Sequence, residues 1–98
     1  MKIEEFLESI RVGELPSELS MALTALWLDA RGDWTAAHDQ LQDAGDLGSD
    51  WVHAYLHRKE GDLINAAYWY RRARRKVFEG TFKQEWDAVV LELLTSTG

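Results

Sequence analysis

Apolar residues recur every three or four positions along most of the chain, and no segment alternates strictly between apolar and polar residues. This spacing matches the turn of an α-helix, so the apolar side chains of each segment fall on one face. In the first segment acidic residues occupy the opposite face, and the apolar face consists of Ile3, Phe6, Leu7 and Ile10. The pattern predicts an all-α fold.

Glycine, proline and capping residues divide the chain into six short helices. Gly13 is expected to end the first helix. Pro16 suits the first position of the second helix, because a backbone N–H group at that position has no hydrogen-bond partner within the helix and proline lacks this group. Gly32 is expected to end that helix, and Asp33 can cap a third helix over 34–44 by accepting hydrogen bonds from its free N–H groups.

The second half of the chain carries similar signals. Ser49 or Asp50 is expected to cap the fourth helix, and Asp62 the fifth, which we expect to continue to Glu79. The spacing T-x-x-Q at 81–84 is typical of a capping box, in which two side chains bond reciprocally to the backbone. These signals predict a last helix after residue 80.

The two halves share a pattern. A shift of 29 residues aligns Ala25 with Ala54, Gly32-Asp33 with Gly61-Asp62, Ala37 with Ala66, Leu41 with Tyr70 and Ala44 with Ala73. The pattern resembles a tetratricopeptide or Sel1-like helix-turn-helix unit over residues 19–76. The stretches ALWLDARGDWTAAH and WVHAYLHRKEGDLINAAYWYRRA are also similar to segments of short, uncharacterised bacterial proteins, which implies no particular activity.

The resemblance implies one helical-repeat domain over 1–98. Two units would occupy 16–79, with an N-terminal capping helix over 1–15 and a C-terminal capping helix over 81–98. Capping is needed because two units leave both ends of the repeat core open. The expected result is a small closed bundle.

The resemblance also implies a concave groove lined by the first helix of each unit. It would present Asp29, Trp51, Tyr55, Arg58 and Lys59. Trp, Tyr and Arg often dominate the binding energy of protein interfaces, and Arg and Lys can hold a carboxylate. The favoured interpretation is therefore a protein-protein interaction adaptor that binds a partner segment, with no catalytic residue, cofactor or metal assigned.

A histidine cluster supports an alternative interpretation. His53 and His57 are four residues apart on one helix, and folding the hairpin between the third and fourth helices brings His38 level with them. Together with Asp33 these residues could form a small-molecule or metal-binding site, or an enzyme site. Ala54 occupies the place of the glutamate in the zinc-protease signature, which excludes that chemistry. A purely structural role, with each imidazole bonded to a carboxylate, tyrosine or carbonyl, is the competing interpretation.

Composition narrows the function classes. The 98 residues contain no cysteine and carry a net charge of −6. We therefore expect a cytoplasmic protein with no disulfide, thiolate metal site or membrane span, and with no role in non-specific nucleic-acid binding. Residues 1–50 hold eleven acids and three bases, whereas residues 71–76 hold five cations. These cations predict a solvated face or a partner-docking patch. Alternatively, the acidic half of one copy of the chain could contact the basic segment of another, which would give head-to-tail homo-oligomers.

Overall fold

The computed structural model describes residues 1–95 and confirms the all-α prediction. Within this range the chain forms six helices: α1 (Ile3–Val12), α2 (Met21–Ala30), α3 (Trp34–Gln40), α4 (Leu47–Glu60), α5 (Leu63–Arg72) and α6 (Phe82–Thr95). The end of the expected C-terminal helix, 96–98, lies outside the described residues. None of the helices over 1–95 combines the length and the apolar character that crossing a membrane requires.

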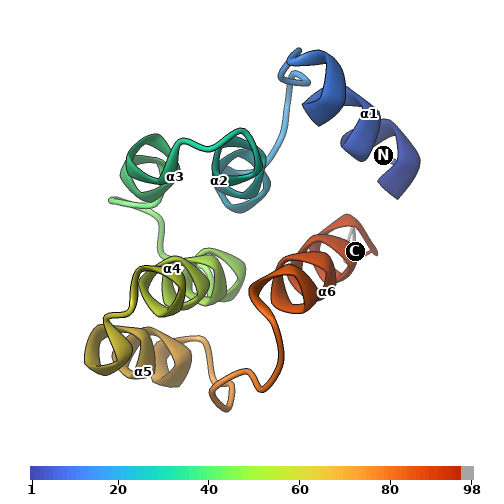
Figure 1. The fold of residues 1–98 in the computed structure, drawn as a ribbon. Coiled ribbons are helices and arrows are strands. Elements are labelled where there is room, and N and C mark those ends of the chain that lie inside the picture. Colours follow the sequence, from blue (N-terminus) through green and yellow to red (C-terminus); the bar gives the residue numbers. More distant parts are fainter. Residues whose placement is uncertain (96–98) are drawn as a thin grey trace.

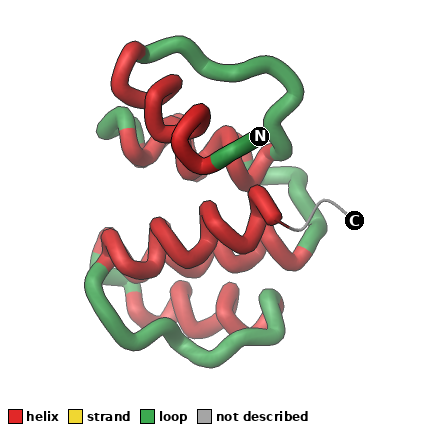
Figure 2. The backbone as a smooth tube through the Cα atoms, turned by 90° about the vertical axis from the view of Figure 1, so that its right-hand side faces the viewer, coloured by secondary structure: helices red, strands yellow, loops and turns green. Residues whose placement is uncertain are grey.

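The helices form two hairpins and a flanking pair. In Figure 1 the α2–α3 hairpin lies above the α4–α5 hairpin, and α6 packs beside α2 and α4 with α1 above it. Figure 2, seen from the side of α1 and α6, shows the loop between α5 and α6 crossing the base of the molecule. Helix α4 is central, because it contacts α2, α3, α5 and α6.

The two Gly-Asp bends are equivalent, as the sequence shift predicts. Gly32 and Gly61 have φ values of 87° and 90°, in the left-handed region that glycine adopts without strain. The N–H groups of Asp33 and Asp62 each bond to a carbonyl of the preceding helix. Their carboxylates accept from the third residue ahead, which caps α3 and α5. One local geometry therefore closes both hairpins.

One helix start and one helix end differ from the sequence prediction. Helix α2 begins at Met21, where Ser20 Oγ accepts from the N–H of the third residue ahead. Pro16 lies instead in the connecting segment just before a turn at Ser17 and Glu18, and the φ of 65° at Glu18 is left-handed. Helix α3 ends at Gln40, short of the predicted boundary.

The caps of α4 and α6 give one correction and one confirmation. Asp46 caps α4, because its carboxylate accepts both the N–H and the Oγ–H of Ser49. Ser49 and Asp50 therefore lie inside the first turn and are not caps. The capping box before α6 is confirmed, because Thr81 N–H donates to Gln84 Oε1 at 2.8 Å and Gln84 N–H donates to Thr81 Oγ1 at 3.0 Å.

Helix α5 ends at Arg72, well before the predicted boundary at Glu79. The cause is Arg74, whose φ of 61° leaves the helical region. Two hydrogen bonds close the end of the helix, from Arg74 N–H to the Arg71 carbonyl and from Arg75 N–H to the Tyr70 carbonyl. This pair of bonds is the Schellman arrangement.

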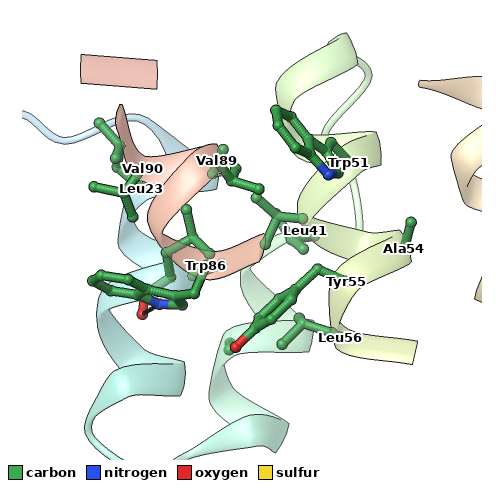
Figure 3. Close-up of a cluster of buried hydrophobic side chains, with 14 of the residues drawn as sticks. Leu23, Leu41, Trp51, Ala54, Tyr55, Leu56, Trp86, Val89 and Val90 are labelled. Atoms are coloured by element: carbon green, nitrogen blue, oxygen red, sulfur yellow. Dashed lines mark hydrogen bonds between the residues drawn. The ribbon is translucent and has the colours of Figure 1, made fainter. Parts of the chain in front are cut away.

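The core lies between α2, α4 and α6. Figure 3 labels buried side chains of this cluster, which come from these helices and, for Leu41, from the end of α3: Leu23, Leu41, Trp51, Ala54, Tyr55, Leu56, Trp86, Val89 and Val90. The indole N–H of Trp86 also donates to the Leu26 carbonyl at 3.0 Å, which fixes α6 against α2. Full burial of one large apolar side chain contributes about 1.5–3 kcal/mol, so these contacts hold α6 in place.

Candidate functional site

The three histidines meet between α3 and α4, as the hairpin predicts. His53 and His57 lie one turn apart on α4 with stacked rings, and His38 on α3 meets both edgewise. The Nε2 atoms of His38 and His53 are 3.1 Å apart. The ring centroids of the three imidazoles are all 4.7–5.4 Å apart. All three nitrogen-bearing rings therefore share one small volume, named here the histidine cluster (His38, His53, His57).

Two tryptophans form walls of the histidine cluster. Trp69 of α5 stacks on His53 with centroids 3.8 Å apart, and Trp34 of α3 stacks on His38 at 5.1 Å. The Trp34 indole donates to the Leu56 carbonyl at 2.9 Å. This hydrogen bond fixes the Trp34 ring against α4, and the His38 ring is fixed because it stacks on Trp34. His53 and His57 are buried, and His38 is half-buried.

Hydrogen bonds set the tautomer of His57. Its Nδ1 lies 2.6 Å from Glu60 Oε1, and an ionised carboxylate only accepts, so Nδ1 carries the proton. In the neutral form of this ring the lone pair lies on Nε2, and the Asn65 amide nitrogen lies 3.4 Å from it. His38 and His53 have no carboxylate partner among the described residues and bond to each other.

The environment of His38 and His53 favours their neutral forms. Burial, with smaller contributions from nearby His38, His57 and Arg72, lowers the pKa of His53 to about 4. Burial also lowers the pKa of His38, with Asp39 and Glu60 opposing that shift. Both rings are therefore unprotonated at neutral pH, which leaves nitrogen lone pairs available for a ligand.

The depressed pKa of His53 predicts acid sensitivity of the metal-free protein. Between pH 6.5 and about 4 the unfolded chain takes up a proton that the folded chain does not, so stability present above pH 6.5 is lost as the pH falls. A shift of this size corresponds to about 3 kcal/mol. Urea unfolding with a chelator present should show the loss, and His53→Gln should lose less over the same range. Equal slopes for both proteins would contradict the prediction.

The cluster provides a geometry that a metal ion can use. One nitrogen from each of His38, His53 and His57 can be chosen so that all three lie within 4.8 Å of one another. Tetrahedral zinc with bonds of 2.0–2.1 Å needs nitrogens about 3.3 Å apart, so modest side-chain movement closes the set. A second set of His57, Glu60 and Asp62 also lies within 4.8 Å, and its two carboxylates are on exposed residues.

Asp33, which the sequence placed with the histidines, does not join them. It is exposed and its carboxylate accepts from the N–H of Ala36 as the cap of α3. Glu60 takes the acidic position near the imidazoles instead. The sequence could not distinguish these acids, because either side of the hairpin could face the cluster.

The expected concave groove is filled by α6. Trp51 and Tyr55 are only 5% and 2% exposed, and they pack against side chains of α6 (Figure 3). Asp29 is also buried. The groove is closed because the apolar face of α6 must be buried, and it packs on the aromatic face of α2 and α4.

Part of the predicted groove still borders a hollow. Asp29, Tyr55 and Lys59 line a space of about 340 Å³ next to Leu7 and other apolar residues of α1 and α6. Within it Tyr55 donates to Asp29 at 2.7 Å, and Lys59 Nζ lies 3.0 Å from the other carboxylate oxygen. The carboxylate is therefore already paired, so this hollow offers mainly apolar walls.

Glu85 is an internal residue that the sequence analysis did not single out. Its side chain is fully buried and accepts from Trp51 at 3.0 Å, from Tyr70 at 2.5 Å and from Arg58 at 3.0 Å. Arg58, predicted for the groove, therefore serves the core. The signal was present in the sequence, because Glu85 lies on the apolar face of its helix, three residues after Phe82.

Comparison of the chain with protein-family models, curated proteins and solved structures gives no match. The histidine cluster is therefore interpreted from its own geometry.

Proposed function

We propose that this chain is a small helical domain that binds a divalent late transition-metal ion, such as Zn²⁺, through His38, His53 and His57. The observation that carries the proposal is the convergence of three ring nitrogens within 4.8 Å. Imidazole nitrogen is a preferred ligand of Zn²⁺, Cu²⁺ and Ni²⁺. Three histidines with a fourth position for water form a known type of zinc site.

A purely structural role explains the cluster less well. A buried structural histidine normally pairs with a group of complementary chemistry, and of the three only His57 has a carboxylate, Glu60, while the Gln42 amide nitrogen lies 3.4 Å from His38 Nδ1. His38 and His53 bond to each other, and protonating both would set two cations 3.1 Å apart. A metal ion resolves this arrangement, because it accepts lone pairs from all three rings at once.

The surroundings of the cluster also suit a metal site. Glu60 holds His57 through Nδ1, which is the carboxylate–histidine contact commonly found behind a metal ligand. Trp34 and Trp69 fix the planes of His38 and His53. Burial lowers the pKa of His38 and of His53, so these two ligands do not have to release a proton when they bind an ion at pH 7.

The test is a Zn²⁺ titration of protein purified without a polyhistidine tag. We expect one ion per chain, and His38→Gln or His53→Gln should each weaken binding by about 100-fold or more, since loss of an outer partner alone costs 10–100-fold. Co²⁺ substitution should give the visible spectrum of a low-coordinate site. Glu60→Gln should weaken binding by about tenfold.

Asp33→Asn is the matched control. It changes an acid on the neighbouring turn that only caps α3, so Zn²⁺ affinity should stay unchanged. Weak binding that is the same in wild type and His38→Gln would overturn the proposal.

A further inference from the structure

Three of the five cations at the end of α5 and in the following loop have no acidic partner among the described residues. Of the five cations in 71–76, Arg72 lies 3.8 Å from Asp50, and Arg75 pairs with Glu92. Within residues 1–95 the side chains of Arg71, Arg74 and Lys76 have no hydrogen bond or ion pair, and all three residues are exposed. Crowded like charges repel one another, so this arrangement does not stabilise the fold by itself.

Arg74, Arg75 and Lys76 border a hollow of about 590 Å³, whose lining also includes Glu79. It is lined by Trp51 and residues 74–79 and is named here the basic hollow. Val77 and Phe78 give it an apolar wall, and Val77 is 54% exposed. A site with cations beside an apolar wall suits a ligand that carries both carboxylates and apolar groups.

Arg74 gives a second, independent observation. It occupies the left-handed position at the end of α5 that glycine fills at the ends of α1, α2 and α4. A side chain in this conformation costs about 1 kcal/mol, and glycine would relieve the strain. Because Arg74 strains the backbone and lies beside other cations, we infer that its side chain serves binding and not the stability of the fold.

We propose that the basic hollow binds an acidic segment of a partner protein. Arg74 and Lys76 supply charge-assisted hydrogen bonds to carboxylates, and Val77 receives an apolar side chain of the same segment. This surface lies mainly on the loop between α5 and α6, and it shares only Trp51 with the groove expected between α2 and α4.

The structure disfavours RNA as the occupant. Single-stranded nucleic acid binds through aromatic rings on which bases stack. Trp51 is only 5% exposed, and the Arg75 guanidinium lies 3.6 Å from its ring centroid. The net charge of −6 also repels a long polyanion, whereas a short acidic segment meets only the local cations.

The experiment measures fluorescence anisotropy of a labelled peptide that alternates glutamate with leucine. Its glutamine counterpart and a labelled oligouridylate are the two comparison probes. We expect the acidic peptide to bind more tightly than either. Arg74→Gly and Lys76→Gln should each weaken binding by about tenfold, and added salt should weaken it further.

Arg74→Gly gives a second readout, because it should raise the melting temperature by a few degrees while it weakens binding. Lys2→Gln removes an equal charge at the residue before α1 and should change neither quantity. The proposal is overturned if the glutamine peptide binds as well as the acidic one, if oligouridylate binds more tightly, or if Arg74→Gly keeps full affinity for the peptide.

Discussion

Glu85→Ala is expected to destabilise the protein by about 3–5 kcal/mol, a large share of the total stability of a domain of this size. The carboxylate is fully buried and accepts from three side chains that come from α4 and α5. Its removal leaves the Trp51 N–H and the Tyr70 hydroxyl unpaired inside the core. Buried donors of this kind have lost their hydrogen bonds to water and have no hydrogen bond within the protein to replace them.

Arg58 makes the loss larger. Its side chain is only 15% exposed, its guanidinium lies 4.9 Å from the Phe82 ring centroid, and it also donates to the Gly80 carbonyl. Without Glu85 a mostly buried cation loses its counter-charge. Because Arg58 joins α4 to the loop before α6, we expect the docking of α6 to weaken first.

Urea unfolding followed by circular dichroism measures the effect. Glu85→Gln keeps the volume and one acceptor, so its loss should be smaller than that of Glu85→Ala and should remain measurable if the alanine variant does not fold. Glu92→Gln is the control, since Glu92 forms an exposed ion pair with Arg75 that is worth about 1 kcal/mol or less. If Glu85→Ala cost no more than Glu92→Gln, the carboxylate would have no structural role.

The helices and their bends could be predicted from the sequence, because their signals are local. Gly32 and Gly61 need only a left-handed residue at the end of one helix and an aspartate at the start of the next. The end of α5 could not be predicted in this way. Glycine signals a left-handed turn, whereas Arg74 adopts that conformation without a local signal.

The histidine cluster was predictable for a similar reason. His53 and His57 share a helix face through their spacing, and the short hairpin fixes the position of His38 beside them. The packing of α6 on α2 and α4 was not predictable, because it depends on contacts between residues far apart in the chain. The bond from Trp86 to the Leu26 carbonyl is such a contact.

Zn²⁺ at about 1,000 times its dissociation constant is expected to stabilise the wild-type protein by about 4 kcal/mol, if the histidine cluster is a metal site. The reason is linkage, because the three ligands converge only in the folded chain. Two ligands lie on α4 and one on α3, so the ion ties these helices together. Unfolding then requires release of the metal.

The stabilisation should concentrate on α3, which has seven residues and buries only Ala37 completely. Hydrogen exchange should therefore slow most at the amides of α3 and least at those of α1, which carries no ligand. His38→Gln removes the one ligand on α3, so Zn²⁺ should no longer protect that helix, whereas Asp33→Asn should retain the protection apart from a weaker cap. An equal gain in melting temperature for wild type and His38→Gln would place the ion elsewhere, because a metal held only by α4 cannot tie α3 to it.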